Sequence, residues 1–252
     1  RNWPVLSAYM PDGMALIAIG GKDYLITSNE GDSGDAEEVR VKDLAGDYAL
    51  NGALFAGYTQ DEPDKLSAEG LFADDQLGRL KTTKIAPKNA DGKYEAVYAF
   101  GGRSFSVRDA ETLALVYDSG DDFERITAKV LPDFFNTDSA ENGFDIRSDD
   151  RGPEPESAAA GVVGGVPYAF IGLETTGGIM IYDLSEPEAP VFVKYISSRS
   201  FSPGGKGGDN GPEGLLFVPA ADSPTGKALL IAAHEISGTI AIYELTPKRP
   251  PL

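Results

Sequence analysis

Cysteine is absent from this chain of 252 residues, and histidine occurs once. Without cysteine the protein has neither disulfides nor thiolate metal sites. Basic residues are also scarce, since 22 Lys and Arg stand against 40 Asp and Glu and give a formal net charge of -18. A surface of this sign repels nucleic acid and anionic lipid, and no stripe of Lys or Arg reverses it. The composition therefore excludes a nucleic-acid-binding role and is compatible with cation binding.

Long hydrophobic runs are missing as well. No apolar segment approaches the roughly 20 residues that a membrane-spanning helix needs, so no membrane span is expected. No signal peptide is present at Arg1, which we interpret as a processed end or the boundary of a cloned segment. Hydrophobic residues make up 41% of the chain, and there are 30 Gly and 17 Pro. This composition is sufficient for a core and typical of a fold with many tight turns.

A unit of three strands recurs along the chain and is clearest between Gly211 and Leu245. Its apolar runs GLLFVPA, ALLIAAHE and TIAIYEL are short, rich in aliphatic residues and bounded by turn residues, which is typical of antiparallel strands. Three signatures recur in the same order elsewhere in the chain. They are a Pro-acid pair (PDG, PES, PEG), an aliphatic run ending in Glu (YLITSNE, AFIGLE, ALLIAAHE) and an alternating run ending in an acid (VRVKDL, IMIYDL, IAIYEL).

The spacing of these signatures predicts four units of about fifty residues, at 9–75, 76–132, 145–200 and 205–247. Repeats of this size predict an all-β fold, an antiparallel β-propeller with four visible blades, and the alternative is a β-sandwich. We assign residues 1–247 to this one domain and residues 248–252 to a tail. The inserted region before residue 76 predicts a short helix at Pro63–Phe72. Because the chain starts inside a strand pattern, we expect a larger ring whose first blades are missing or are supplied by another chain.

Carboxylates recur at the corners of these units. One set opens the first strand of a unit and the other closes the second strand; the residues are Asp12, Glu156 and Glu213, and Glu30, Glu174 and Glu235. Antiparallel neighbours bring the start of one strand beside the end of the next, so both sets are predicted to rim one mouth of the channel. Converging carboxylates repel one another unless a cation lies between them. Oxygen ligands without cysteine suit Ca²⁺ or another hard divalent cation better than Zn²⁺.

Alternatives stay open for these residues. An acid next to Pro or Gly often does no more than accept hydrogen bonds from turn N–H groups. Glu154 competes with Glu156, because DRGPE at 150–154 matches DNGPE at 209–213. Asp32 in SNEGDSGD is a further candidate ligand at the same mouth, and the alternative is a solvated acidic turn.

Three basic side chains are candidates for a catalytic role. His234 is a candidate ligand or general acid/base, although on a strand its side chain should point opposite to that of Glu235. Arg40 and Arg103 are candidates for binding the phosphate or carboxylate of a small anionic molecule. The alternative is that each arginine pairs with a nearby acid, such as Glu37, Glu38 or Asp109. No G-x-S-x-G, P-loop or H-E-x-x-H motif occurs.

Long ordered segments of the chain resemble a known family. They are PDGMALIAIGGKDYLITSNEGDSGDAEEVRVKDL, GGRSFSVRDAETLALVYDSGDDFE, RGPEPESAAAGVVGGVPYAFIGLETTGGIMIYDL and GPEGLLFVPAADSPTGKALLIAAHEISGTIAIYEL. They resemble the choice-of-anchor I family of bacterial extracellular β-propeller proteins, which is related to mesenchyme-specific cell-surface glycoproteins. The resemblance implies export to the cell surface, the medium or the periplasm, and a ring of about seven blades.

Some members of that family are described as atypical alkaline phosphatases. A divalent ion held by the carboxylates would polarise a phosphate or other ester and lower the pKa of its own bound water. From the residues and the resemblance together we expect a secreted, divalent-cation-binding propeller that acts as a metal-dependent phosphate-ester hydrolase. The alternative is a non-enzymatic extracellular or cell-surface module with a binding or structural role.

Overall fold

The computed structural model describes residues 2–34, 38–201 and 207–247. The chain divides into two compact units, which we call the smaller and the larger unit. The smaller unit consists of Arg1–Met10, Gly31–Gly102 and Ser148–Arg151, and the larger one of Pro11–Glu30, Arg103–Arg147 and Gly152–Leu252. No helix within the described ranges is long and apolar enough to cross a membrane.

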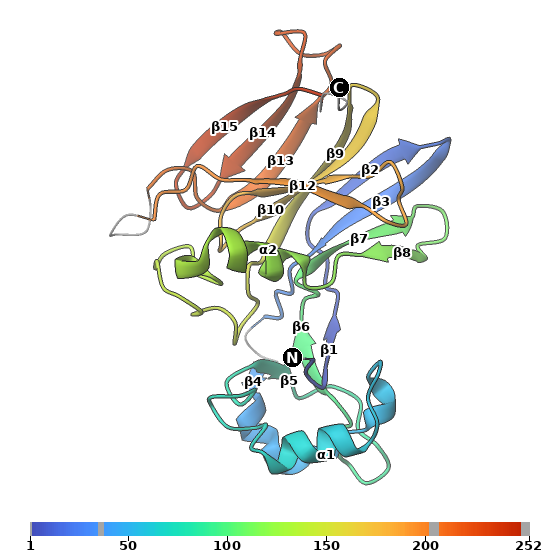
Figure 1. The fold of residues 1–252 in the computed structure, drawn as a ribbon, viewed down its shortest axis with the longest axis vertical. Coiled ribbons are helices and arrows are strands. Elements are labelled where there is room, and N and C mark those ends of the chain that lie inside the picture. The colour runs from blue at the N-terminus through green and yellow to red at the C-terminus, as the bar shows by residue number, and fades with distance from the viewer. Residues whose placement is uncertain (1, 35–37, 202–206, 248–252) are drawn as a thin grey trace. The chain divides into compact units, whose positions relative to one another are not determined.

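The larger unit holds three antiparallel sheets (Figure 1). The strand order of the first sheet is β2 (Met14–Ile19), β3 (Lys22–Asn29), β7 (Ser104–Asp109) and β8 (Leu115–Asp118). That of the second sheet is β9 (Pro155–Val163), β10 (Val166–Leu173), β11 (Ile179–Asp183) and β12 (Val191–Ile196). The third sheet consists of β13 (Pro212–Val218), β14 (Ala228–His234) and β15 (Thr239–Leu245). Each sheet is a meander in chain order, and β9 contacts β2 and β3 of the first sheet and β13 of the third.

Glycine pairs set the first hairpin of two of these sheets. Gly20 and Gly21 join β2 to β3, and Gly164 and Gly165 join β9 to β10, all with positive φ. The two-residue type I′ hairpin turn, whose twist matches that of the flanking strands, needs positive φ at both central positions, which glycine adopts without strain. The turn chemistry therefore fixes the register of the two hairpins, in which Ile19 pairs with Lys22 and Val163 with Val166.

Two hydrophobic cores lie on opposite faces of the second sheet. On β10, Ile171 belongs to the core shared with the first sheet, whereas its neighbour Phe170 belongs to the core shared with the third. This alternation follows the period of two in a strand and leaves the sheet buried on both faces. Helix α2 (Asp122–Val130) covers the first of the two cores with Phe123 and Ile126 and is followed by the 3₁₀ turn η4 (Pro132–Phe134).

The smaller unit has little sheet structure. Its strands form two pairs, one parallel between β1 (Val5–Ala8) and β6 (Val97–Phe100), and one antiparallel between β4 (Glu38–Arg40) and β5 (Lys81–Thr83). Between them lie the 3₁₀ segments η2 (Val41–Asp47) and η3 (Gly52–Leu54) and helix α1 (Asp61–Ala68). The unit has a core of its own, in which Val41, Leu71 and Val97 are buried.

The structure confirms an all-β chain of mainly antiparallel strands and the short helix expected near Pro63–Phe72, which is α1. The division into four repeat units is wrong in its first half. Strands β7 and β8 had been assigned to a second unit, but they complete the sheet of β2 and β3, because residues 31–102 fold as an insertion between β3 and β7. The larger unit therefore contains three sheets of the repeat type among its described residues. The proposed tail, residues 248–252, lies outside the described residues.

Candidate functional site

One end of the three sheets of the larger unit carries a group of acidic side chains. The strand registers pair Met14 with Thr27, Pro155 with Leu173, and Pro212 with His234. Each hairpin therefore places the acid that precedes or opens its first strand at the same end as the acid that follows its second strand. We call the following residues the carboxylate cluster: Asp12, Glu30, Glu154, Glu156, Glu174, Glu213 and Glu235.

Within the cluster, two overlapping groups of three carboxylates are close enough to share an ion. One group is Asp12, Glu30 and Glu156, and the other is Glu30, Glu154 and Glu174. In each group one oxygen of every carboxylate lies within 4.8 Å of an oxygen of the other two, and Glu30 is common to both. Glu213 and Glu235 of the third sheet belong to neither group, but Glu213 is close enough for its charge to act on Glu156 and Glu174. The cluster therefore joins acids from all three sheets.

Several of these carboxylates are buried. The exposed fraction is 7% for Glu30, 1% for Glu154 and 9% for Glu156. A buried charge is costly unless a partner compensates it. Arg147 supplies such a partner, since its guanidinium forms an ion pair with Glu154 and lies 3.6 Å from Asp138. This guanidinium offsets part of the negative charge that the fold gathers here.

Burial and mutual repulsion raise the pKa of three cluster residues. Burial, the side-chain hydrogen bond with Asp12 and the charge of Glu30 raise the pKa of Glu156 to about 10. Burial and the neighbouring Glu154 raise the pKa of Glu174 to about 8. The pKa of Glu213 is raised by burial and by Glu235. At neutral pH, with no cation bound, the protonated forms of Glu156 and Glu174 are therefore favoured.

Close backbone approaches hold the first and second sheets together at the cluster. The Gly13 N–H donates to the Glu156 carbonyl at 2.8 Å, and Ser28 Oγ donates to the same carbonyl. A Cβ on Gly13 would lie 2.5 Å from that oxygen and 2.7 Å from the Ala158 nitrogen, so only glycine fits.

An equivalent contact ties the second sheet to the third. Ser157 Oγ donates to the Pro212 carbonyl at 2.7 Å, beside Gly172, where a Cβ would lie 2.8 Å from the same oxygen. These serines and glycines fix the backbones that carry Glu156 and Glu213. No local sequence pattern marks these residues, because their role comes from contacts between sheets.

Other candidate residues do not belong to the cluster. Asp32 lies in the smaller unit, where its largely exposed carboxylate is 3.5 Å from Arg151. His234 is buried on β14, belongs to neither group of three carboxylates, and its pKa is lowered by burial. It is therefore neutral at physiological pH.

Both candidate arginines are engaged in ion pairs. Arg40, in the smaller unit, lies 3.3 Å from Asp149, and Arg103, in the larger unit, lies 3.0 Å from Glu124. Both arginines therefore pair with an acid, as the alternative interpretation predicted, although the partners differ from those expected. Of the expected partners, Glu37 lies outside the described residues, Glu38 pairs with Lys81 at 2.8 Å and Asp109 with Lys22 at 2.6 Å.

Glu154 and Glu156 were alternatives for the same position, and the structure places both of them in the carboxylate cluster. Glu156 lies on β9, whereas Glu154 precedes the strand with a φ of 48° and reaches the second group of carboxylates. Arg147 was not anticipated. It lies in the connector rich in Asp and Asn, and only its position seven residues before Glu154 would have drawn attention to it.

Comparison with known proteins identifies the family. Residues 1–187 match the model of the choice-of-anchor I domain. The chain belongs to the choice-of-anchor I domain family. The matched part of this choice-of-anchor I domain includes both groups of three carboxylates, whereas Glu213 and Glu235 lie beyond it. The resemblance drawn from the sequence motifs is confirmed.

Two relatives show how far the likeness extends. This choice-of-anchor I domain is 31% identical over 193 residues to Gigasin-3a of Magallana gigas. The aligned region covers 71% of this chain and 68% of Gigasin-3a. This chain is 27% identical over 195 residues to the Mesenchyme-specific cell surface glycoprotein of Strongylocentrotus purpuratus. That match covers 66% of this chain but 24% of the sea-urchin protein, so the chain spans about a quarter of that relative's length.

Proposed function

We propose that this choice-of-anchor I domain is a non-enzymatic extracellular or cell-surface module that holds a divalent cation, most suitably Ca²⁺, in its carboxylate cluster. The cation would tie together the ends of three sheets and stiffen them. One relative is named a cell surface glycoprotein, which supports the location. The observation that carries the proposal is the pair of overlapping carboxylate groups that share Glu30.

Electrostatics shows why such a cluster calls for a cation. Two ionised carboxylates at 4.8 Å repel each other by about 3.5 kcal/mol at an effective dielectric constant of about 20. The three pairs of one group would cost about 10 kcal/mol, which is comparable with the whole stability of a domain. Protons, a cation or basic side chains such as Arg147 must therefore compensate the charge of the cluster.

The geometry suits calcium. Ca²⁺ binds six to eight oxygen atoms at about 2.4 Å, so two oxygens on the same ion are at most about 4.8 Å apart. Both groups of three meet this limit. Carboxylates without thiolate or histidine partners are ligands that a hard cation prefers.

We further propose that the three sheets are blades of a β-propeller whose ring is completed by residues outside this chain or by another chain. Strand order runs outward from β2, β9 and β13 in the three sheets, as in propeller blades. The outer faces of the first and third sheets carry exposed apolar side chains, including Met14 and Leu16 on one and Ile240 and Ile242 on the other. A further blade on each face would cover them, in a ring of about seven.

The hydrolase hypothesis is less favoured. Arg40 and Arg103 were the candidates for orienting the anion, but Arg103 is paired with Glu124 and Arg40 with Asp149. His234 is buried and belongs to neither group of three carboxylates. The cation is therefore assigned a structural role.

Calcium titration of the purified chain tests the proposal. We expect calorimetry to show Ca²⁺ binding, a thermal unfolding temperature that rises with Ca²⁺, and no turnover of p-nitrophenyl phosphate or acetate. Glu30→Gln removes the residue common to both groups and should weaken binding at least about tenfold. Glu186→Gln, at an exposed site, is the matched control and should bind like the wild type.

Two outcomes would contradict the proposal. If millimolar Ca²⁺ neither binds nor shifts the unfolding temperature of the wild type, the cation site is wrong. If the chain hydrolyses either ester and Glu30→Gln abolishes that turnover while circular dichroism shows a folded protein, the hydrolase hypothesis replaces the non-enzymatic one.

A further inference from the structure

In the described part of the chain, the third sheet of the larger unit has one strand fewer than its two neighbours. The first and second sheets each have four strands and end in β8 and β12, whereas the third ends in β15. Strand β15 pairs with β14 along its whole length, and no described strand pairs with its other edge. An edge of this kind offers a row of N–H and C=O groups to an added strand.

The fourth strand of the first sheet shows what such a strand does. Val116 and Tyr117 of β8 pack in the core between the first and second sheets, together with Phe192 and Tyr195 of β12. On its other face, β12 directs Val193 and Ile196 into the core shared with the third sheet. Strand β8 fills its position on one side of β12, whereas at the equivalent position on the other side these two residues meet no fourth strand among the described residues of that sheet.

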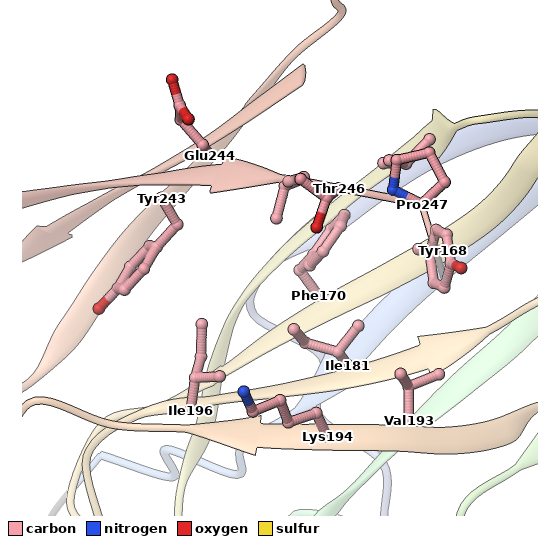
Figure 2. A pocket seen from close by; sticks show the side chains of 12 residues that line it. Tyr168, Phe170, Ile181, Val193, Lys194, Ile196, Tyr243, Glu244, Thr246 and Pro247 are labelled. Atoms are coloured by element: carbon pink, nitrogen blue, oxygen red, sulfur yellow. The ribbon is translucent and has the colours of Figure 1, made fainter. Parts of the chain in front are cut away.

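A pocket lies at this position (Figure 2). It has a volume of about 430 Å³, and its lining includes Ile181, Val193 and Ile196 on the second sheet and Tyr243 and Leu245 on β15. Figure 2 shows Tyr243 pointing from β15 toward the space that Ile181, Val193 and Ile196 line from the second sheet. The pocket therefore joins an apolar wall to an open strand edge.

Charged side chains at the pocket favour an occupant that carries an acidic group. Lys194 lies among the apolar lining residues and is exposed. Glu244, which also borders the pocket, is paired with Lys227 at 2.6 Å. An acidic side chain on the occupant would face Lys194. The net charge of -18 opposes the approach of a second copy of this chain.

We propose that this pocket and the edge of β15 bind an extended segment of a partner polypeptide, which adds a fourth strand to the third sheet. Its apolar side chains at alternate positions fill the pocket, its backbone pairs with β15, and an acid on it faces Lys194. A compact apolar ligand would fill the pocket but leave the strand edge unpaired, whereas a strand satisfies both. The inference is independent of the proposed cation, because the carboxylate cluster lies at the ends of the strands and not at this edge.

The chain itself provides a probe of this chemistry. A capped, fluorescein-labelled peptide of residues 111–119 (ETLALVYDS) contains the strand β8, which already serves as a fourth strand and carries an acid. Binding is measured by fluorescence anisotropy on the full chain, with Ca²⁺ and again with chelator. Hydrogen exchange with mass spectrometry then locates the peptide. At saturation, we expect exchange in Thr239–Leu245 to slow roughly tenfold, with the smaller unit unchanged.

Matched variants on β12 test the pocket. Val193→Asn places a polar group on its wall and should weaken peptide binding at least about fivefold. Val191→Asn, on the same strand but exposed and outside the pocket, should change binding by less than about twofold. Saturating peptide that leaves the exchange of β15 unchanged, or equal loss in the two variants, would overturn the proposal. Sedimentation showing a dimer in which β15 is protected without peptide would assign the edge to a second copy and overturn it as well.

Discussion

Cation binding by the carboxylate cluster should strengthen steeply as the pH rises. A carboxylate must lose its proton to bind a metal, and the pKa values of Glu156 and Glu174 are raised to about 10 and about 8. Between about pH 5 and pH 8, a cation held by both carboxylate groups would therefore release about two protons, so that affinity rises about a hundredfold per pH unit. Between pH 8 and 10 only Glu156 is still protonated, and the rise falls to about tenfold per unit.

Without a cation, the same two groups make stability fall with rising pH. Their pKa is higher in the folded chain than the ordinary value of 4.5, so the folded state binds more protons than the unfolded one. The contribution of these groups to stability is complete below pH 4.5. It is lost as the pH rises toward 8 for Glu174 and toward 10 for Glu156. Chelator and excess Ca²⁺ should therefore give unfolding temperatures that diverge with pH.

Calorimetric Ca²⁺ titration at pH 7 in two buffers of different ionisation enthalpy counts the protons released. Glu156→Gln should release about one proton fewer than the wild type, whereas the exposed control Glu186→Gln should release the same number. Equal affinity at pH 6 and pH 8, or an unchanged proton count in Glu156→Gln, would refute the reasoning.

Two further predictions concern the surroundings of the cluster. Arg147→Met leaves the buried Glu154 without its guanidinium and should lower the free energy of unfolding by about 3–5 kcal/mol in urea titrations at pH 7; a loss below about 1 kcal/mol would contradict the role of this pair. Gly13→Ala forces a Cβ against the Glu156 carbonyl and should cost about 1–3 kcal/mol in the same assay, whereas Gly46→Ala, with nothing within 4 Å, should change stability little. Equal effects of the two alanines would rule out the close approach as the cause.

Local patterns were enough to predict the hairpins and the side on which their acids lie. Gly20-Gly21 and Gly164-Gly165 carry their turn chemistry in the sequence, and the register they impose places Glu30 and Glu174 beside the starts of the strands that precede them. A repeat seen in the sequence thus became a cluster in space, because hairpin geometry is local.

The insertion could not be predicted in the same way. Whether the partner of β3 is the next strand in the chain or one some seventy residues later depends on tertiary contacts, and VRVKDL at residues 39–44 imitates the repeat while forming β4 and the start of η2. The burial of Glu154 and its ion pair with Arg147 could not be predicted from the sequence either. Arg147 lies in no periodic pattern, and its role follows only from the position of Glu154 in the folded chain.

The pairing of Asn29 with Ser104 at the ends of β3 and β7 has a consequence for how this family can vary. The chain leaves the first sheet and returns to it at adjacent points, so a short loop would be long enough to connect the two strands. Segments of very different size can then replace residues 31–102 without shifting the alignment of β3 against β7. The pairing of β3 with β7 then stays the same, while the segment inserted between the two strands can be lengthened, shortened or exchanged.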